Sequence, residues 1–175
     1  ILSTLMSAAA KPSDDWNSAA ITLASKQGAP DLFASIAAEG NTSSGPLLQS
    51  LAMASSVTLP GLRQVLETVA GSDLTAETKE KLIGQLAKND LPQGNSSLLQ
   101  PLRVLEQSGD MRLVSSSASL RHALKLPPSP EFLNSTTASL RAVIDTSLPD
   151  TVRLQHLDMI SLLPYNRKSD VLFAC

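Results

Sequence analysis

Two histidines, His122 and His156, are the side chains with the widest chemical use in this sequence, because imidazole binds metals and moves protons near neutral pH. They are the only histidines among the 175 residues. Neither belongs to a His-Glu-x-x-His or His-x-x-x-His pattern, which would place two metal ligands on one face of a helix. We therefore expect both histidines to be structural or surface residues, and the sequence predicts no metal site.

The other candidates for chemistry each have a structural explanation that we favour. Asp14 and Asp15 are adjacent, and adjacent residues do not share a helix face, so helix capping is a better explanation than an acid/base pair. Cys175 has no basic neighbours, which favours a small apolar core residue over a reactive thiol. Residues 165–168, Tyr-Asn-Arg-Lys, form either a binding edge or a solvated turn, and we favour the turn.

Larger catalytic patterns do not occur in the sequence, which has no glycine-rich phosphate loop and no nucleophile elbow. A single cysteine excludes an internal disulfide and a Cys-x-x-Cys-His haem attachment within these residues. We therefore predict no catalytic residue, no cofactor-binding residue and no cofactor in this chain. Asn-x-Ser/Thr patterns begin at Asn41, Asn95 and Asn134, but this short pattern arises by chance, and we predict no glycosylation from it.

A Leu-Arg dipeptide recurs along the chain and ends at Arg63, Arg103, Arg121 and Arg141. Such arginines either line a concave groove for an anionic ligand or lie over the packed face and pair locally with carboxylates. The net charge is −2 and no basic stripe accompanies the arginines, so binding to nucleic acid has little electrostatic support.

The composition favours helices packed on helices. Apolar residues make up 42% of the chain and aromatic residues only 3%, while Ala, Leu and Ser dominate. Sheets favour β-branched and aromatic residues, which are sparse here, and we find no alternating segment of strand length. The length suits a single domain, 1–175, with a substantial core, and no apolar run approaches the length of a membrane span.

Apolar spacing with a period of 3.6, together with Gly and Pro stop signals, predicts eleven helices. They cover residues 1–9, about 15–27, 30–39, 46–57, 62–70, 72–89, 97–107, 111–126, 132–147, 150–163 and 167–175. The strongest interruption is Pro-Pro-Ser-Pro at 127–130, which is an irregular connection or a bend. Self-similar helix pairs predict an all-α, HEAT-like α-solenoid, a right-handed superhelix of antiparallel pairs.

The apolar phase of each predicted helix also identifies core residues. The residues expected to lie buried between stacked helices are Trp16, Ile21, Leu32, Phe33, Leu140, Ile144, Leu157, Ile160 and Leu172.

Segments near both ends of the sequence carry a family resemblance. Residues 137–143, 148–154 and 160–165, and residues 16–21 leading to Leu32-Phe33, resemble the helical repeat region of large planctomycete-type proteins. Those proteins join a β-propeller dehydrogenase-like domain, HEAT-like repeats and a C-terminal cytochrome c module. The resemblance implies an exported or periplasmic parent that carries haem c outside this chain, and no catalytic residue of the family carries over onto these residues.

Two classes of function follow. The first is a non-catalytic scaffold or spacer between the redox modules of such a parent, with the flanking domains of the same polypeptide as its partners. The second is a HEAT-type adaptor that binds another protein or a peptide. Because the first and last helices lack caps and end in apolar residues, we expect the chain to be an excised part of a longer polypeptide. We predict no enzymatic activity in the chain itself and no nucleic-acid partner.

Overall fold

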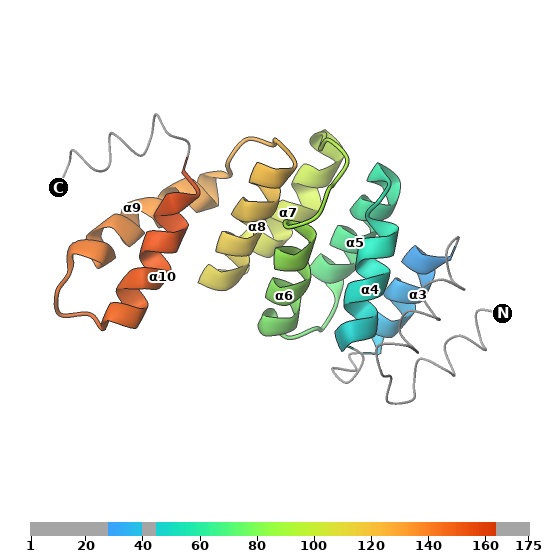
Figure 1. The fold of residues 1–175 in the computed structure, drawn as a ribbon, viewed down its shortest axis with the longest axis horizontal. Helices are drawn as coiled ribbons and strands as arrows, with labels where there is room; N and C mark the ends of the chain where they lie inside the picture. The colour runs from blue at the N-terminus through green and yellow to red at the C-terminus, as the bar shows by residue number, and fades with distance from the viewer. Residues whose placement is uncertain (1–27, 40–44, 164–175) are drawn as a thin grey trace. The chain divides into compact units, whose positions relative to one another are not determined.

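A computed structural model of the chain describes residues 28–39 and 45–163, and within these residues it is all-helical, with no strand. The chain divides into two compact units, Ile1–Leu126 and Pro127–Cys175. The elements of the first unit are α3 (Ala29–Ala38), α4 (Gly45–Ser55), α5 (Leu59–Gly71), α6 (Ala76–Leu86), the 3-10 helix η2 (Ser96–Leu98), α7 (Leu99–Glu106) and α8 (Met111–Ala123), and those of the second unit are α9 (Pro130–Ile144) and α10 (Asp150–Ser161) (Figure 1).

Eight of the eleven predicted helices fall in the described residues, and all eight are present, with shifted ends. The sequence pattern places Pro60 and Gly61 in a break between the predicted helices 46–57 and 62–70, and this placement is wrong. Both residues lie in the first turn of α5, where the missing N–H of a proline costs nothing, and the Thr58 side chain caps this turn by accepting from the Gly61 N–H at 3.3 Å. Helix α6 begins at Ala76 rather than at 72, because Thr75 caps it by accepting from the Thr78 N–H.

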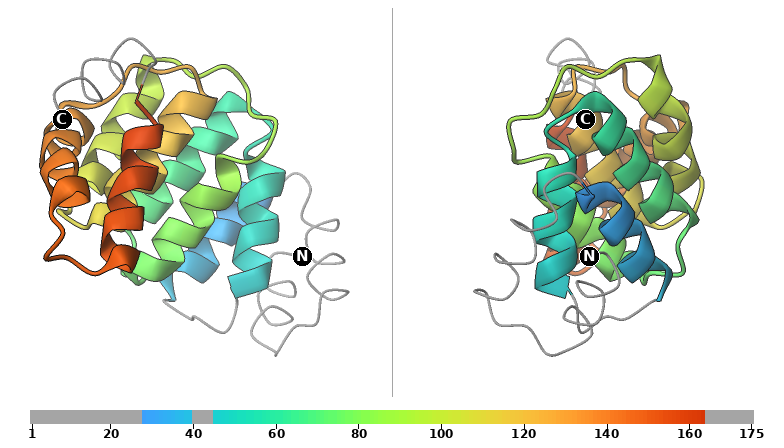
Figure 2. Two further views of the ribbon diagram at one scale, coloured as in Figure 1. Left: turned by 60° about the vertical axis from the view of Figure 1, so that its left-hand side comes forward. Right: turned by 90° about the vertical axis from the view of Figure 1, so that its right-hand side faces the viewer.

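The helices of the first unit form two rows. Helix α5 packs between α3 and α7, and helix α6 packs between α4 and α8, while α3 contacts α4 and α7 contacts α8 across the rows. Figures 1 and 2 show α4, α6 and α8 side by side in front of the other row. The Gln64 amide donates to the Asp31 carboxylate at 3.0 Å, which joins the N-terminal halves of α5 and α3. Helices α3 and α5 therefore lie side by side with their N-terminal halves together.

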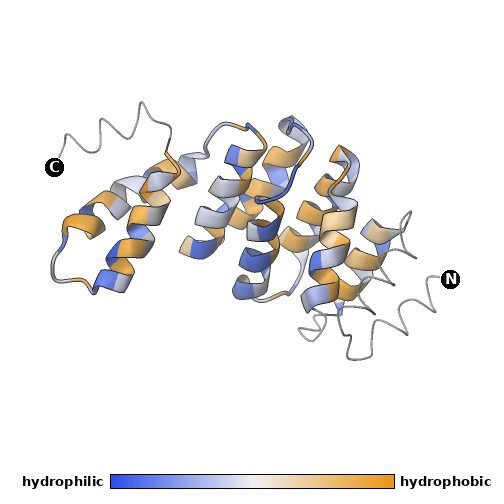
Figure 3. Ribbon diagram, viewed as in Figure 1, coloured by the Kyte–Doolittle hydropathy of each residue, from blue (hydrophilic) through white to orange (hydrophobic). Residues whose placement is uncertain are grey.

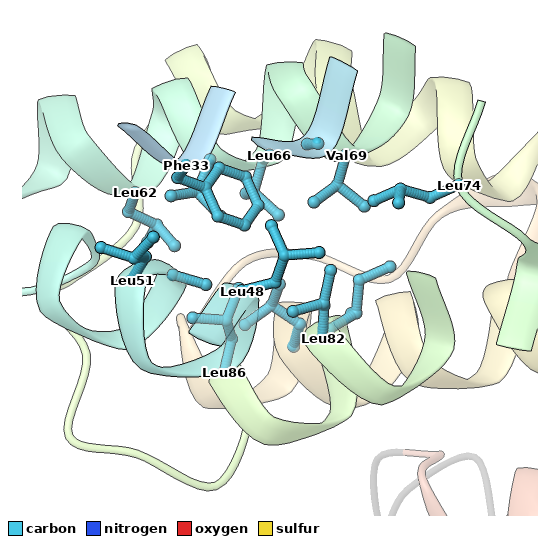
Figure 4. Packing of buried hydrophobic residues seen from close by; sticks show 14 of the residues in the cluster. Phe33, Leu48, Leu51, Leu62, Leu66, Val69, Leu74, Leu82 and Leu86 are labelled. Atoms are coloured by element: carbon cyan, nitrogen blue, oxygen red, sulfur yellow. The ribbon is translucent and has the colours of Figure 1, made fainter. Parts of the chain in front are cut away.

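One continuous apolar core fills the space between the two rows and extends from Ala29 to Leu124. Figure 4 shows Phe33, Leu48, Leu66 and Leu82 converging from α3, α4, α5 and α6. All four side chains are buried, and full burial of such a side chain contributes about 1.5–3 kcal/mol. Hydrophilic residues gather on the visible side of α6 in Figure 3, so this helix has one solvent-exposed face and one buried face.

The close approach of α4 to the start of α5 depends on a glycine. A methyl group at Gly61 would overlap the backbone carbonyl of Ser55. Gly61→Ala is therefore expected to lower the free energy of unfolding by about 1–3 kcal/mol, measured by urea denaturation. Gly84→Ala is the matched control, because nothing lies within 4 Å of the added methyl in α6, and it should stabilise by about 0.5–1 kcal/mol. Equal effects at the two positions would show that the contact with Ser55 is not limiting.

The connection between α6 and α7 covers residues 87–95 and is held against the end of α8. The Gly94 N–H donates to the Leu124 carbonyl at 3.1 Å. A side chain at Gly94 would approach Leu124 and Leu126 to within about 3 Å, so only glycine fits without displacing its neighbours. This connection therefore ties α8 to the turn that precedes α7.

The second unit contains a helical hairpin in which α9 and α10 pack together. The face that α9 buries is Phe132, Thr136 and Ser139. The hydroxyl of Thr136 can be buried because it donates to the Leu133 carbonyl at 2.7 Å. A helix can thus bury hydroxyl side chains where the sequence pattern predicts leucine.

This unexpected face corrects part of the predicted core. Leu32, Phe33 and Ile160 are buried as predicted, but Leu140 is only half-buried, and Ile144 and Leu157 are 58% and 47% exposed. The prediction is wrong for Ile144 because α9 turns its hydroxyl face inward, and it is wrong for Leu157 because α10 buries Met159 and Ile160 instead. The remaining predicted core residues, Trp16, Ile21 and Leu172, lie outside the described residues.

Candidate functional site

The charged side chains that are buried within the described residues, Glu106 and Arg121, form an ion pair between α7 and α8. The Arg121 guanidinium donates to both carboxylate oxygens of Glu106, from Nε to Oε1 at 2.7 Å and from Nη2 to Oε2 at 3.0 Å. The Arg121 side chain is 6% exposed and the Glu106 side chain is fully buried. Two parallel hydrogen bonds between planar groups fix both distance and angle, so the pair sets how these two helices meet.

The pair occupies positions that are apolar or small in the neighbouring helices. Counted from the first helical residue, Glu106 is the eighth residue of α7, where α3 and α5 bury Ile36 and Leu66. Arg121 is the eleventh residue of α8, where α4 and α6 bury Ser55 and Leu86. The charged pair therefore stands at positions where the neighbouring helices bury uncharged side chains.

The same helix α8 carries a buried hydroxyl where its neighbours carry leucine. Ser117 is its seventh residue and is fully buried, whereas the seventh residues of α4 and α6 are Leu51 and Leu82. The Ser117 hydroxyl has no hydrogen-bond partner, an arrangement that costs free energy in a core. At this position α8 therefore places a small polar side chain where α4 and α6 place a leucine.

A second group of charges lies on the surface where α6 and α8 begin. Lys81 contacts Glu77 at 2.6 Å, and Arg112 contacts Asp110 at 2.9 Å. The hydrogen bond from Lys81 holds the pKa of Glu77 below its ordinary value, and the same bond raises the pKa of Lys81. Positive and negative groups alternate here, so this surface has no single sign that would select an anionic or cationic ligand.

Asp110 both caps α8 and pairs with Arg112. Its carboxylate accepts from the Arg112 N–H at 2.9 Å, and the hydrogen bond from the Arg112 guanidinium lowers the pKa of Asp110. Asp110→Ala is therefore expected to cost about 0.5–2 kcal/mol at neutral pH, measured by urea denaturation. Because the folded-state pKa is lowered, the carboxylate stabilises the fold above its unfolded-state pKa. The difference from wild type should shrink as pH falls through the folded-state pKa.

Asp110→Asn separates the two roles of this residue. Asparagine keeps a side-chain oxygen that can cap the helix but loses the charge, so the expected cost is below about 1 kcal/mol at neutral pH, and it should shrink as pH falls through the folded-state pKa of Asp110. A cost as large as that of the alanine variant would assign the effect to the ion pair with Arg112 instead of to the cap.

In the second unit a histidine and a serine lie in contact. His156 Nδ1 is 3.0 Å from Ser139 Oγ, and the Ser139 hydroxyl donates to the Met159 sulfur at 3.3 Å. Which of the two atoms donates in the His156–Ser139 contact depends on the tautomer of His156. A nucleophilic serine must be reachable by its substrate, and Ser139 is fully buried. The contact therefore links α9 to α10 through polar side chains.

The sequence-predicted candidates are dispersed in the structure. His122 is exposed on α8 and His156 is half-buried on α10. No three His, Cys, Asp or Glu side chains gather as a possible metal site in the part of the chain that the structure describes. Asp14, Asp15, Cys175 and residues 165–168 lie outside that part.

The recurring arginines have different environments. Arg63 is exposed and pairs with Glu67 at 2.7 Å along α5, Arg103 and Arg141 are exposed, and Arg121 is buried. Local pairing with a carboxylate, one of the two interpretations of this pattern, therefore describes Arg63 and Arg121. Glu106 was not predicted from the sequence. One sequence signal could have indicated that Glu106 is buried. Glu106 is the eighth residue of its helix, and the eighth residues of α3 and α5 are the apolar Ile36 and Leu66.

The comparisons with known proteins add no relative. The chain matches no family model, no curated protein and no solved structure. Within residues 28–39 and 45–163, every helix is too short or too polar to cross a bilayer.

Proposed function

We propose that this chain is a HEAT-like α-solenoid that acts as a non-catalytic scaffold. The observation that carries the proposal is the packing of alternate helices into two rows, α3–α5–α7 and α4–α6–α8. In an array of helix pairs, each pair buries its apolar face against its neighbours only, and the rows extend by one helix with each pair.

Equivalent positions in one row support the same proposal. The fourth residues of α3, α5 and α7 are Leu32, Leu62 and Leu102, and all three are fully buried. The Leu-Arg dipeptide of the sequence coincides with this position in α5 and α7, since the leucine enters the core and the following residue points outward. A periodic sequence element thus corresponds to a periodic packing position.

A stacked array keeps its ends at a constant distance and orientation, which is the property that a spacer between two domains needs. The resemblance to the repeat region of planctomycete-type proteins supplies the neighbours: an oxidising β-propeller domain and a cytochrome c module in an exported parent. In this proposal the chain holds these two modules so that electrons pass between them, and it contributes no reacting group of its own.

An adaptor that binds another protein is the second candidate. It is favoured by Ile144, Leu154 and Leu157, three large apolar side chains on α9 and α10 that are 58%, 58% and 47% exposed. Exposed apolar groups of this kind often mark contact surfaces.

Replacing this segment in the full-length parent by a flexible Gly/Ser linker of matched span distinguishes the two functions. A spacer predicts a slower electron transfer from substrate to haem, measured by stopped-flow absorbance of the haem, because a flexible linker no longer fixes the distance between modules. An unchanged rate would reject the spacer and favour the adaptor. The matched control is the parent with Leu154→Ser and Leu157→Ser, which leaves the array in place and removes only exposed apolar side chains.

A further inference from the structure

We infer that the buried pair of Glu106 and Arg121 is a register lock, which makes α7 dock on α8 in one position along their axes. The pair lies within the first unit and joins two consecutive helices through two hydrogen bonds of 2.7 and 3.0 Å. Buried polar groups are best known for specifying register, because every displaced arrangement separates the partners.

Helix α7 needs such a device more than the other helices of its row. It has 8 residues, against 10 in α3 and 13 in α5. A short helix buries fewer side chains, so apolar packing determines the place of α7 along α8 less strongly.

The contact face of α8 adds to this freedom. Ser117 is buried in its centre, where α4 and α6 have Leu51 and Leu82 at the equivalent position. Small side chains leave shallow ridges, and shallow ridges distinguish poorly between neighbouring registers. The turn that follows α7 also contains Gly109 at a φ of 76°, a conformation that favours glycine and adjusts readily.

The ion pair removes the alternative registers. If α7 slides by one helical turn, Leu102 or Arg103 takes the place of Glu106 opposite Arg121. The first leaves the buried guanidinium facing an apolar side chain, and the second brings two positive charges together. Both separate Arg121 from its counter-ion inside the core, which is strongly unfavourable.

The test is a double variant in which both charged residues are replaced by leucine, Glu106→Leu with Arg121→Leu. Leucine is chosen because α5 and α6 have Leu66 and Leu86 at the equivalent positions. The readout is the Gly109 amide resonance in a ¹H–¹⁵N correlation spectrum of the full chain, because this glycine lies in the turn between α7 and α8. Wild type should give one Gly109 resonance. The double-leucine variant should keep its helical circular dichroism and give a second Gly109 resonance, while Gly71 at the end of α5 stays single.

If the double-leucine variant gives one Gly109 resonance and has the same oligomeric state as wild type, the register lock is overturned. Loss of helical circular dichroism would overturn it too, since the pair would then be required for folding itself. The reversed pair, Glu106→Arg with Arg121→Glu, gives an independent test. It keeps opposite charges in contact and should restore a single Gly109 resonance, whereas two resonances would show that the charges do not set the register.

Discussion

Glu106→Leu is expected to destabilise the protein by about 3–5 kcal/mol, because the single substitution leaves the buried guanidinium of Arg121 without its counter-ion. In the native structure this guanidinium donates two hydrogen bonds to Glu106, and both side chains are almost inaccessible to water. The measurement is the free energy of unfolding from urea denaturation, followed by far-ultraviolet circular dichroism.

The matched control for this variant is Glu67→Leu. Glu67 also pairs with an arginine at 2.7 Å, but Arg63 and Glu67 are about half exposed. Water and salt screen such a pair, so the same substitution should cost below about 1 kcal/mol. If the two variants lose similar stability, burial is not what gives the Glu106 pair its importance.

Phe33→Ala is expected to cost about 3–5 kcal/mol, since it removes a fully buried aromatic ring from the core between α3, α4 and α5. If the first unit is an array of helix pairs, the loss should be local. Native-state hydrogen exchange should then show amides of α3 and α4 losing most protection and amides of α7 and α8 losing least.

Ser35→Ala is the control on the same helix. Ser35 donates only to the Asp31 carbonyl of its own helix, so the change should stay within about 0.5 kcal/mol. Uniform loss of protection in Phe33→Ala, from α3 to α8, would contradict an array and indicate one cooperative globular unit.

The helices could be predicted from the sequence because their local signals are strong and independent of the rest of the chain. Pro30 and Pro46 mark the starts of α3 and α4, and the 3.6-residue spacing of Leu32 and Ile36 identifies a buried face. Local signals failed where two of them conflict. Pro60-Gly61 resembles a break, but a capping threonine two residues before the proline converts the same pair into a helix start.

Burial in the second unit could not be predicted because it depends on partners that are distant in sequence. Ser139 is buried since Met159 and His156, on another helix, satisfy its hydroxyl. Hydrophobicity alone placed Ile144 inside, whereas Ile144 is exposed and Ser139 of the same helix is buried. The same holds for Glu106, whose burial depends on an arginine fifteen residues later. Polar burial is a property of pairs, and a pattern of single residues does not reveal pairs.

The hydrogen bond from Gly94 to Leu124 also has a consequence for the timing of synthesis. Leu124 follows Gly94 by thirty residues, which a ribosome adds in roughly 1.5–6 s at about 5–20 residues per second. Helices α3 to α6 are complete by then and can pack on one another, while the connection 87–95 still waits for the end of α8. We therefore expect helices α3 to α6 of the nascent chain to pack early, and α7 and α8 to close onto them as a separate, later event.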